Sequence, residues 1–218
     1  MKEILKYLDF IAPLIALIFI LLNKMVLKQK AIKYLFYFLI VQLFFNGIAI
    51  SITLIHKYFL HNSGNNLIFF HLNCLFSFYI LLNYFKEINI IKRKVWLLLI
   101  FLISYISYLV IEDGFFLFNS VGFSLASLVI IILCFKYYYF LLKNPQVDNF
   151  FYSHDFWITT GLLTYYVCNF IIFLTFSYLA KSTPHTGNLW LFHNVVFAIL
   201  CIYLIKGVSC KKKELISF

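Results

Sequence analysis

Neutral polar side chains, mainly asparagine and histidine, recur within the long apolar stretches of this chain. Such side chains donate and accept hydrogen bonds without a charge, so they suit a small polar ligand or bonding between helices. We predict a ligand-binding set of Asn46, His71, Asn73, Asn119, Tyr165, Asn169, Trp190, His193 and Asn194. Two pairs, Tyr165 with Asn169 and Trp190 with Asn194, are four residues apart, which places each pair on one helix face.

Catalytic and metal chemistry find little support in the residue pattern. The chain contains no HExxH, GxSxG or Walker A motif. Asp9 is the one acidic residue well within an apolar run, near its outer end, and no second carboxylate accompanies it. The five cysteines lack metal-ligand spacing, and the last apolar run has no central lysine that could hold retinal. The sequence therefore favours a protein without catalytic activity, metal or cofactor.

The composition indicates a lipid environment. The 218-residue chain is 64% hydrophobic and 12% charged, whereas soluble domains are about 45–50% apolar and about 25% charged. The formal net charge of +10 would suggest nucleic acid for a soluble protein. In a membrane protein, however, lysines gather at helix ends and set the topology. We expect the lipid bilayer as a partner and no nucleic acid.

Seven apolar runs predict membrane-spanning helices, since a span takes about 20 residues. They cover residues 8–22, 31–55, 67–84, 95–111, 115–142, 156–180 and 188–206. The first run follows a basic start, but no small-x-small cleavage site comes after it, so we expect a retained helix. The prediction is one transmembrane domain over residues 1–218, an all-α integral membrane bundle of seven helices.

The lysines predict the orientation. Four basic residues fall on one side of the seven predicted spans: Lys2, Lys6, Lys57 and Lys181. The remaining 14 of the 18 fall on the other side: Lys24, Lys28, Lys30, Lys33, Lys86, Lys92, Arg93, Lys94, Lys136, Lys143, Lys206, Lys211, Lys212 and Lys213. By the positive-inside rule the N-terminus is outside and the C-terminus is cytoplasmic.

This orientation places most of the polar side chains in the outer half of the bundle. One interpretation is an outward-opening pocket that binds a small polar or amphiphilic ligand. The alternative is that these groups only bond helix to helix, as such side chains do in membranes at about 0.6 kcal/mol each. The sequence leaves both interpretations open.

Three short patterns resemble small bacterial seven-helix inner-membrane proteins, some of whose genes accompany histidine kinases and response regulators. The patterns are Phe118-Asn119-Ser120, Phe156-Trp157-Ile158 with Gly161 and Tyr165, and Trp190 with His193-Asn194. The resemblance implies a sensory or accessory module in the bacterial inner membrane. Such relatives often carry a Glu in the third helix and an Arg or Pro near the C-terminus, and this chain departs from both.

The expected function is ligand sensing or partner binding in the membrane. The tail after Lys206 is too short for an output domain, so a membrane or cytoplasmic protein would meet the basic inner face. Two alternatives stay open, a small-solute transporter and a lipid-modifying enzyme.

Overall fold

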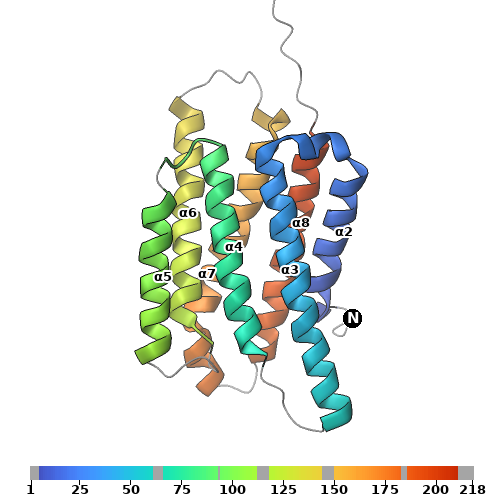
Figure 1. Ribbon diagram of the computed structural model, residues 1–218, viewed down its shortest axis with the longest axis vertical. Helices are drawn as coiled ribbons and strands as arrows, with labels where there is room; N and C mark the ends of the chain where they lie inside the picture. The colour runs from blue at the N-terminus through green and yellow to red at the C-terminus, as the bar shows by residue number, and fades with distance from the viewer. Residues whose placement is uncertain are drawn as a thin grey trace, which may run out of the picture.

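The computed structural model describes residues 5–60, 66–92, 94–111, 118–143, 150–182 and 186–210, which form an all-helical bundle (Figure 1). Its α-helices are α2 (Leu8–Leu22), α3 (Lys30–Ile55), α4 (Leu67–Glu87), α5 (Lys94–Ile111), α6 (Ser120–Lys143), α7 (His154–Ser182) and α8 (Thr186–Ser209). Short 3-10 turns cover Lys24–Lys28 (η1) and Phe150–Tyr152 (η4), and a π-helical turn, His56–Leu60 (η2), extends α3. Within these ranges no strand occurs.

The all-α prediction is confirmed, and each predicted span has its helix. The fifth span differs at its start: residues 115–117 lie outside the described part of the chain, and Phe118 and Asn119 precede the helix. The side-chain Oδ1 of Asn119 accepts a hydrogen bond of 2.7 Å from the backbone N–H of Gly122. Asn119 is therefore the N-cap of α6, which begins at Ser120.

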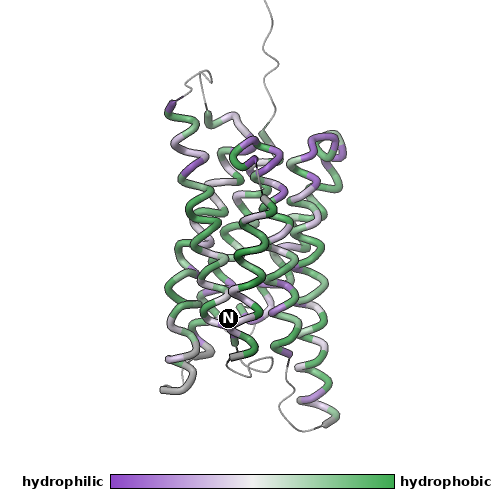
Figure 2. The backbone as a smooth tube through the Cα atoms, turned by 60° about the vertical axis from the view of Figure 1, so that its left-hand side comes forward, coloured by the Kyte–Doolittle hydropathy of each residue, from purple (hydrophilic) through white to green (hydrophobic). Residues whose placement is uncertain are grey.

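Five helices are long and apolar enough to cross a membrane: Lys30–Ile55, Leu67–Glu87, Ser120–Lys143, His154–Phe176 and Asn188–Ser209. Apolar residues cover the middle of the bundle (Figure 2), and large side chains such as Ile103 and Ile202 are 64% and 65% exposed. The chain is thus a membrane protein. The helices α2 and α5 are apolar but shorter; the 15 residues of α2 rise about 22 Å, against a hydrocarbon core of about 30 Å. A count of seven crossings stays a prediction.

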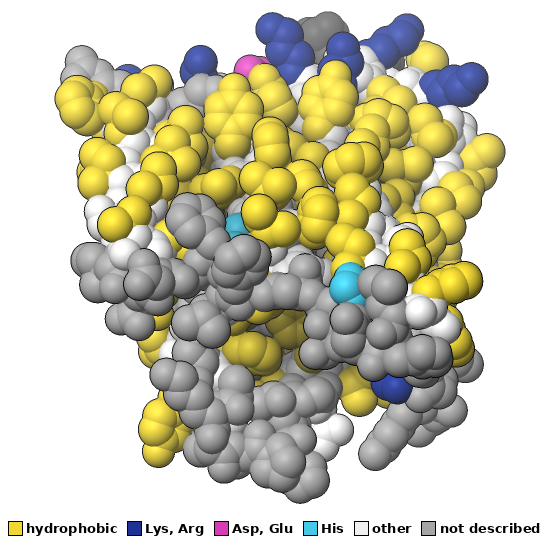
Figure 3. All heavy atoms as spheres, turned by 60° about the horizontal axis from the view of Figure 1, so that its bottom comes forward, with side chains coloured by type: hydrophobic (Ala, Val, Ile, Leu, Met, Phe, Trp, Pro, Cys, Tyr) yellow, Lys and Arg dark blue, Asp and Glu magenta, His cyan; other side chains and the backbone are white. Residues whose placement is uncertain are grey.

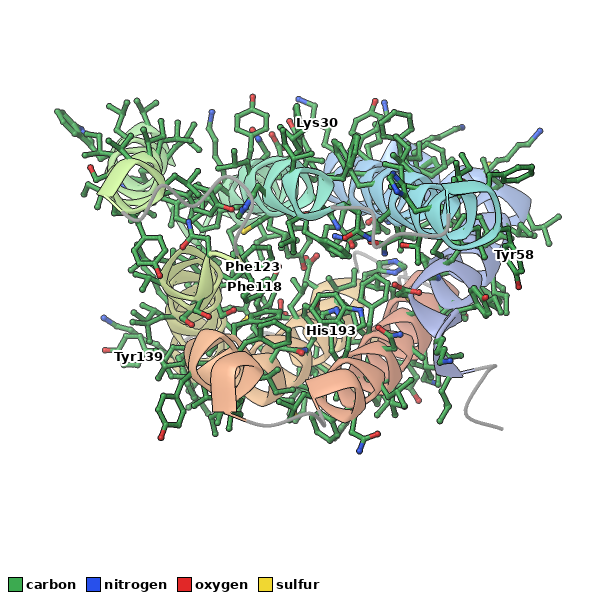
Figure 4. All side chains as sticks on the ribbon, turned by 90° about the horizontal axis from the view of Figure 1, so that it is seen from below. Lys30, Tyr58, Phe118, Phe123, Tyr139 and His193 are labelled. Carbon is green, nitrogen blue, oxygen red and sulfur yellow. The ribbon has the colours of Figure 1, made fainter. Side chains whose placement is uncertain are left out.

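Six of the helices form a closed ring, and α5 lies outside it. Contacts run from α2 to α3, α4, α6, α7 and α8 and return from α8 to α2. The helix α5 packs against α4 and α6 at one corner (Figure 4). In the same view His193 points into the ring, whereas Lys30, Tyr58 and Tyr139 lie at its perimeter.

Basic residues gather at one end of the bundle, which we call the lysine end. There α2, α4, α6 and α8 finish and α3, α5 and α7 start (Figure 1). At these helix ends and links the structure describes the side chains of Lys24, Lys28, Lys30, Lys33, Lys86, Lys92, Lys136, Lys143 and Lys206, and α5 itself begins at Lys94. Figure 3 shows most of the blue side chains along this rim, above a belt of apolar atoms.

The α7–α8 pair approaches closely because glycine stands at two contact points. A Cβ added to Gly161 would lie 2.5 Å from Cβ of Tyr203, and one added to Gly207 would lie 2.9 Å from a side-chain atom of Ile158. Small residues at such points let helix backbones come together in membranes.

Gly161→Ala tests this packing. We expect a loss of about 1–3 kcal/mol in the free energy of unfolding, because the added Cβ meets a Cβ that cannot rotate away. Thermal exposure of the buried thiols Cys74, Cys134 and Cys201 to a thiol-reactive dye would measure it. The matched control is Gly47→Ala, whose Cβ meets only the edge of the Phe10 ring at 3.3 Å. Equal unfolding temperatures for the two variants would contradict the close approach.

Candidate functional site

A cavity of about 50 Å³ lies inside the helix ring, and we call it the polar cavity. It is lined by Asp9, Gln42, Asn46, Phe70, Asn73, Cys74, Ser77, Phe78, Phe123, Ala126, Ser127, Tyr165, Tyr166, Phe173, Trp190, His193 and Phe197. Asp9, Asn73 and Trp190 belong to the first two turns of α2, α4 and α8. Those helices begin opposite the lysine end (Figure 1), so the cavity lies in the half of the bundle with few lysines.

The structure brings five of the nine predicted residues to this cavity: Asn46, Asn73, Tyr165, Trp190 and His193. The other four, His71, Asn119, Asn169 and Asn194, do not line it. Each of these four makes a hydrogen bond with a structural purpose. The predicted set therefore divides into lining residues and supporting residues, and ligand binding by either group stays a prediction.

Asn46 bonds a backbone carbonyl that a proline has freed. Pro13 lies inside α2 and has no N–H, so the carbonyl four residues earlier, that of Asp9, loses its helical donor. The side-chain Nδ2 of Asn46 on α3 donates to this carbonyl oxygen at 3.0 Å. Inside a membrane protein a proline is tolerated where a neighbouring helix supplies the missing hydrogen bond in this way. The Oδ1 of Asn46 is left as an acceptor.

Asn194 fixes the segment that precedes α2. Its Nδ2 lies 3.1 Å from the carbonyl oxygen of Leu5 and 3.2 Å from that of Lys6 and donates to them. Together with Asn46, it holds the start of α2 between α3 and α8. The consequence is the position of Asp9, which is only 7% exposed and faces the cavity. Its Oδ1 is buried and has no hydrogen-bond partner among the described residues.

Three side chains of α3 and α4 form a closed hydrogen-bond ring. Nε2 of Gln42 donates to Oγ of Ser77 at 2.8 Å, and this hydroxyl donates to Oδ1 of Asn73 at 3.1 Å. Nδ2 of Asn73 then donates back to Oε1 of Gln42 at 3.0 Å. Each side chain in the ring both donates and accepts, so the ring joins α3 to α4 as one fixed wall of the cavity.

His193 lies at the centre of an aromatic wall and is oriented by Asn169. Nδ2 of Asn169 donates to the backbone carbonyl of Tyr165 at 2.8 Å, so its Oδ1 accepts from Nδ1 of His193 at 2.7 Å. In neutral imidazole this leaves Nε2 as the acceptor. Rings of Trp190, Phe173 and Tyr165 surround it with centroids at 4.8, 5.5 and 5.7 Å.

His71 and Asn119 belong to the docking site of α5 rather than to the cavity lining. Nδ1 of His71 shares a hydrogen bond of 2.7 Å with the hydroxyl of Tyr105 on α5. A Cβ added to Gly122 would lie 2.4 Å from the Tyr105 ring. The N-cap Asn119 starts α6 so that this glycine faces α5. These residues therefore hold α5 against the ring of six helices.

The dimensions of the polar cavity limit what it can hold. A water molecule needs about 10–15 Å³ by this measure, so about 50 Å³ accepts about four non-hydrogen atoms. Sites for drug-sized ligands measure about 300–1,000 Å³. A large amphiphilic ligand does not fit this conformation, whereas a small polar ligand does.

Sequence reasoning left Asp9 out of the predicted site. Its place near the end of an apolar run suggested a peripheral carboxylate. The feature of the sequence that could have indicated its role is Pro13. This proline frees the Asp9 carbonyl, which then requires a hydrogen-bond donor from another helix.

A double-mutant cycle tests the bond between Asn46 and the freed carbonyl. Asn46→Leu should cost about 1 kcal/mol of unfolding free energy, because a buried carbonyl loses its donor. In the Pro13→Ala background the restored N–H of residue 13 can satisfy that carbonyl, so the same change should cost clearly less. Chemical unfolding in mixed micelles measures both. Additive losses would contradict the proposed link.

No family model, curated protein or solved structure matches this chain. The resemblance to small bacterial seven-helix proteins therefore stays a prediction.

Proposed function

We propose that this chain is a seven-span protein of the bacterial inner membrane, with its N-terminus outside and its C-terminus in the cytoplasm. It is a sensory or accessory module that binds a small polar ligand in the outer half and passes a change to a membrane or cytoplasmic partner. The observation that carries the proposal is the polar cavity, with polar groups from α2, α3, α4, α6, α7 and α8 converging on one small space. Convergence of a few polar groups in an aromatic pocket is typical of ligand sites.

The helix α8 connects this cavity with the lysine end. Trp190 and His193 line the cavity in its first turns, and Lys206 stands in its last turn. A shift of α8 on ligand binding would thus move the basic surface that a partner meets. Small helix shifts of this kind are a common route from a ligand site to an interface.

A transporter is the second candidate, and the packing beneath the cavity argues against it. Toward the lysine end the ring is filled by side chains that are at most 1% exposed: Ile20, Leu39, Leu81, Tyr84 and Leu204. A solute path would require these to separate. The lipid-modifying alternative has no group of three or more metal-ligand side chains among the described residues to support it.

The orientation is tested by labelling Cys210 in a variant whose other four cysteines are replaced. We expect an impermeant maleimide to modify it only after the cytoplasmic face is opened, because Cys210 follows α8 at the lysine end. Burial raises the pKa of this thiol, and the smaller opposing effect of Lys206 does not cancel it, so labelling should become faster as the pH rises. Labelling of Cys210 in intact cells would overturn the orientation.

The sensor proposal is tested by His193→Leu in a mild-detergent pull-down with mass spectrometry. The wild-type protein should retain a protein partner and a small molecule, and the variant should lose the small molecule. The matched control is His154→Leu, since His154 bonds the Gly207 carbonyl near the lysine end and lies outside the cavity lining. A wild-type protein that is solitary and ligand-free yet moves a solute into liposomes would establish the transporter instead.

A further inference from the structure

The polar cavity has one feature that selects a class of ligand, the carboxylate of Asp9, which faces no cationic side chain among the described lining residues. The residue is 7% exposed, it lines the cavity, and its Oδ1 has no partner within the described residues. No lysine or arginine is among the described residues that line the cavity. A buried carboxylate without a cation is costly, so a positive charge in the cavity would be strongly favoured.

We propose that the ligand of this cavity is a small organic ammonium ion whose charge is held by Asp9. This inference rests on the proposed ligand-binding function and names the chemical class of the ligand. Asp9 binds the charge of the cation. Asn46 holds the Asp9 carbonyl through Nδ2 and offers its Oδ1 to the cation, and Asn194, which holds the preceding backbone, is a positioning residue.

The hydrogen-bonding groups left over in the cavity match an ammonium ion. A primary ammonium has three donors and no acceptor. The corresponding acceptors among the lining residues are the carboxylate of Asp9, Oδ1 of Asn46, whose Nδ2 holds the Asp9 carbonyl, and Nε2 of His193, whose Nδ1 donates to Asn169. The neutral amides of the Gln42–Asn73–Ser77 ring are occupied with each other.

The aromatic side chains that line the rest of the cavity suit both the alkyl chain and the charge of an organic ammonium ion. Trp190, Tyr165, Phe173 and Phe197 contribute aromatic surface, and aromatic faces attract cations when water is excluded. An alkali ion would gain less from such walls, and an anion would be repelled by Asp9. The small volume admits about four non-hydrogen atoms, so methylammonium to propylammonium fit and larger amines do not.

The test is calorimetric titration of the purified full chain with methylammonium and propylammonium chloride at constant ionic strength. A small ligand gains at most about 1.5 kcal/mol of binding free energy per non-hydrogen atom, so the Kd of methylammonium should lie in the millimolar range. Propylammonium should bind more tightly, and hexylammonium more weakly than propylammonium. Sodium chloride, methanol and acetate should produce no saturable heat.

Asp9→Asn should weaken binding at least tenfold. The variant should also unfold at no lower temperature than the wild type, because the carboxylate oxygen that it replaces has no partner. The matched control, Glu87→Gln, makes the same change in the last residue of α4 at the lysine end and should leave binding unchanged.

Three results would overturn the inference: equal binding by Asp9→Asn, equal binding of sodium, or a variant that unfolds far below the wild type. If a neutral or anionic molecule co-purifies and Asp9→Asn keeps it, the ammonium assignment fails while ligand sensing stands. If methylammonium binds through Asp9 and is carried into liposomes, the assignment stands and the sensor proposal fails.

Discussion

A hydrogen bond between Asn46 and the Asp9 carbonyl determines how the start of α2 sits in the bundle. Pro13 removes the helical donor of this carbonyl, and a carbonyl without a donor inside a membrane protein is destabilising. Asn46 supplies the donor from α3, and Asn194 supplies another from α8 to the preceding backbone. The shortest helix of the ring is thereby fixed between its two neighbours, and the carboxyl group of Asp9 is carried into the interior.

The other polar groups fall into two kinds around this arrangement. Some exist to join helices: the Gln42–Asn73–Ser77 ring joins α3 to α4, and His71 with Tyr105 joins α5 to α4. Others keep an unused acceptor toward the cavity, as Asp9 does. Bonding between helices thus accounts for some members of this cluster, and ligand binding by the others stays a prediction.

Apolar run length and turn residues were enough to predict the seven helices, because a helix in lipid must satisfy its own backbone. The lysine pattern also anticipated the single basic end. The division of the polar residues into those that line the cavity and those that support it could not be predicted. It depends on the side-chain rotamers and on which neighbouring helix each side chain reaches. Asn119 and Asn46 are both asparagines within predicted spans, so the sequence does not distinguish them, yet Asn119 caps a helix end. Asp9 was missed for two reasons. Pro13 acts on it only through the backbone carbonyl, and Asn46, which bonds that carbonyl, is distant in sequence.

The most direct measurement uses Cys74, a native thiol in the lining of the polar cavity, as the only cysteine of the chain. Its modification by small methanethiosulfonates is followed in intact cells with a thiol scavenger in the cytoplasm. The account predicts that methylammonium slows the modification by methyl methanethiosulfonate, the smallest reagent of the series, and that this protection is lost in Asp9→Asn. Access only from the cytoplasm, or equal protection in the wild type and in Asp9→Asn, would contradict an outward-facing cation cavity.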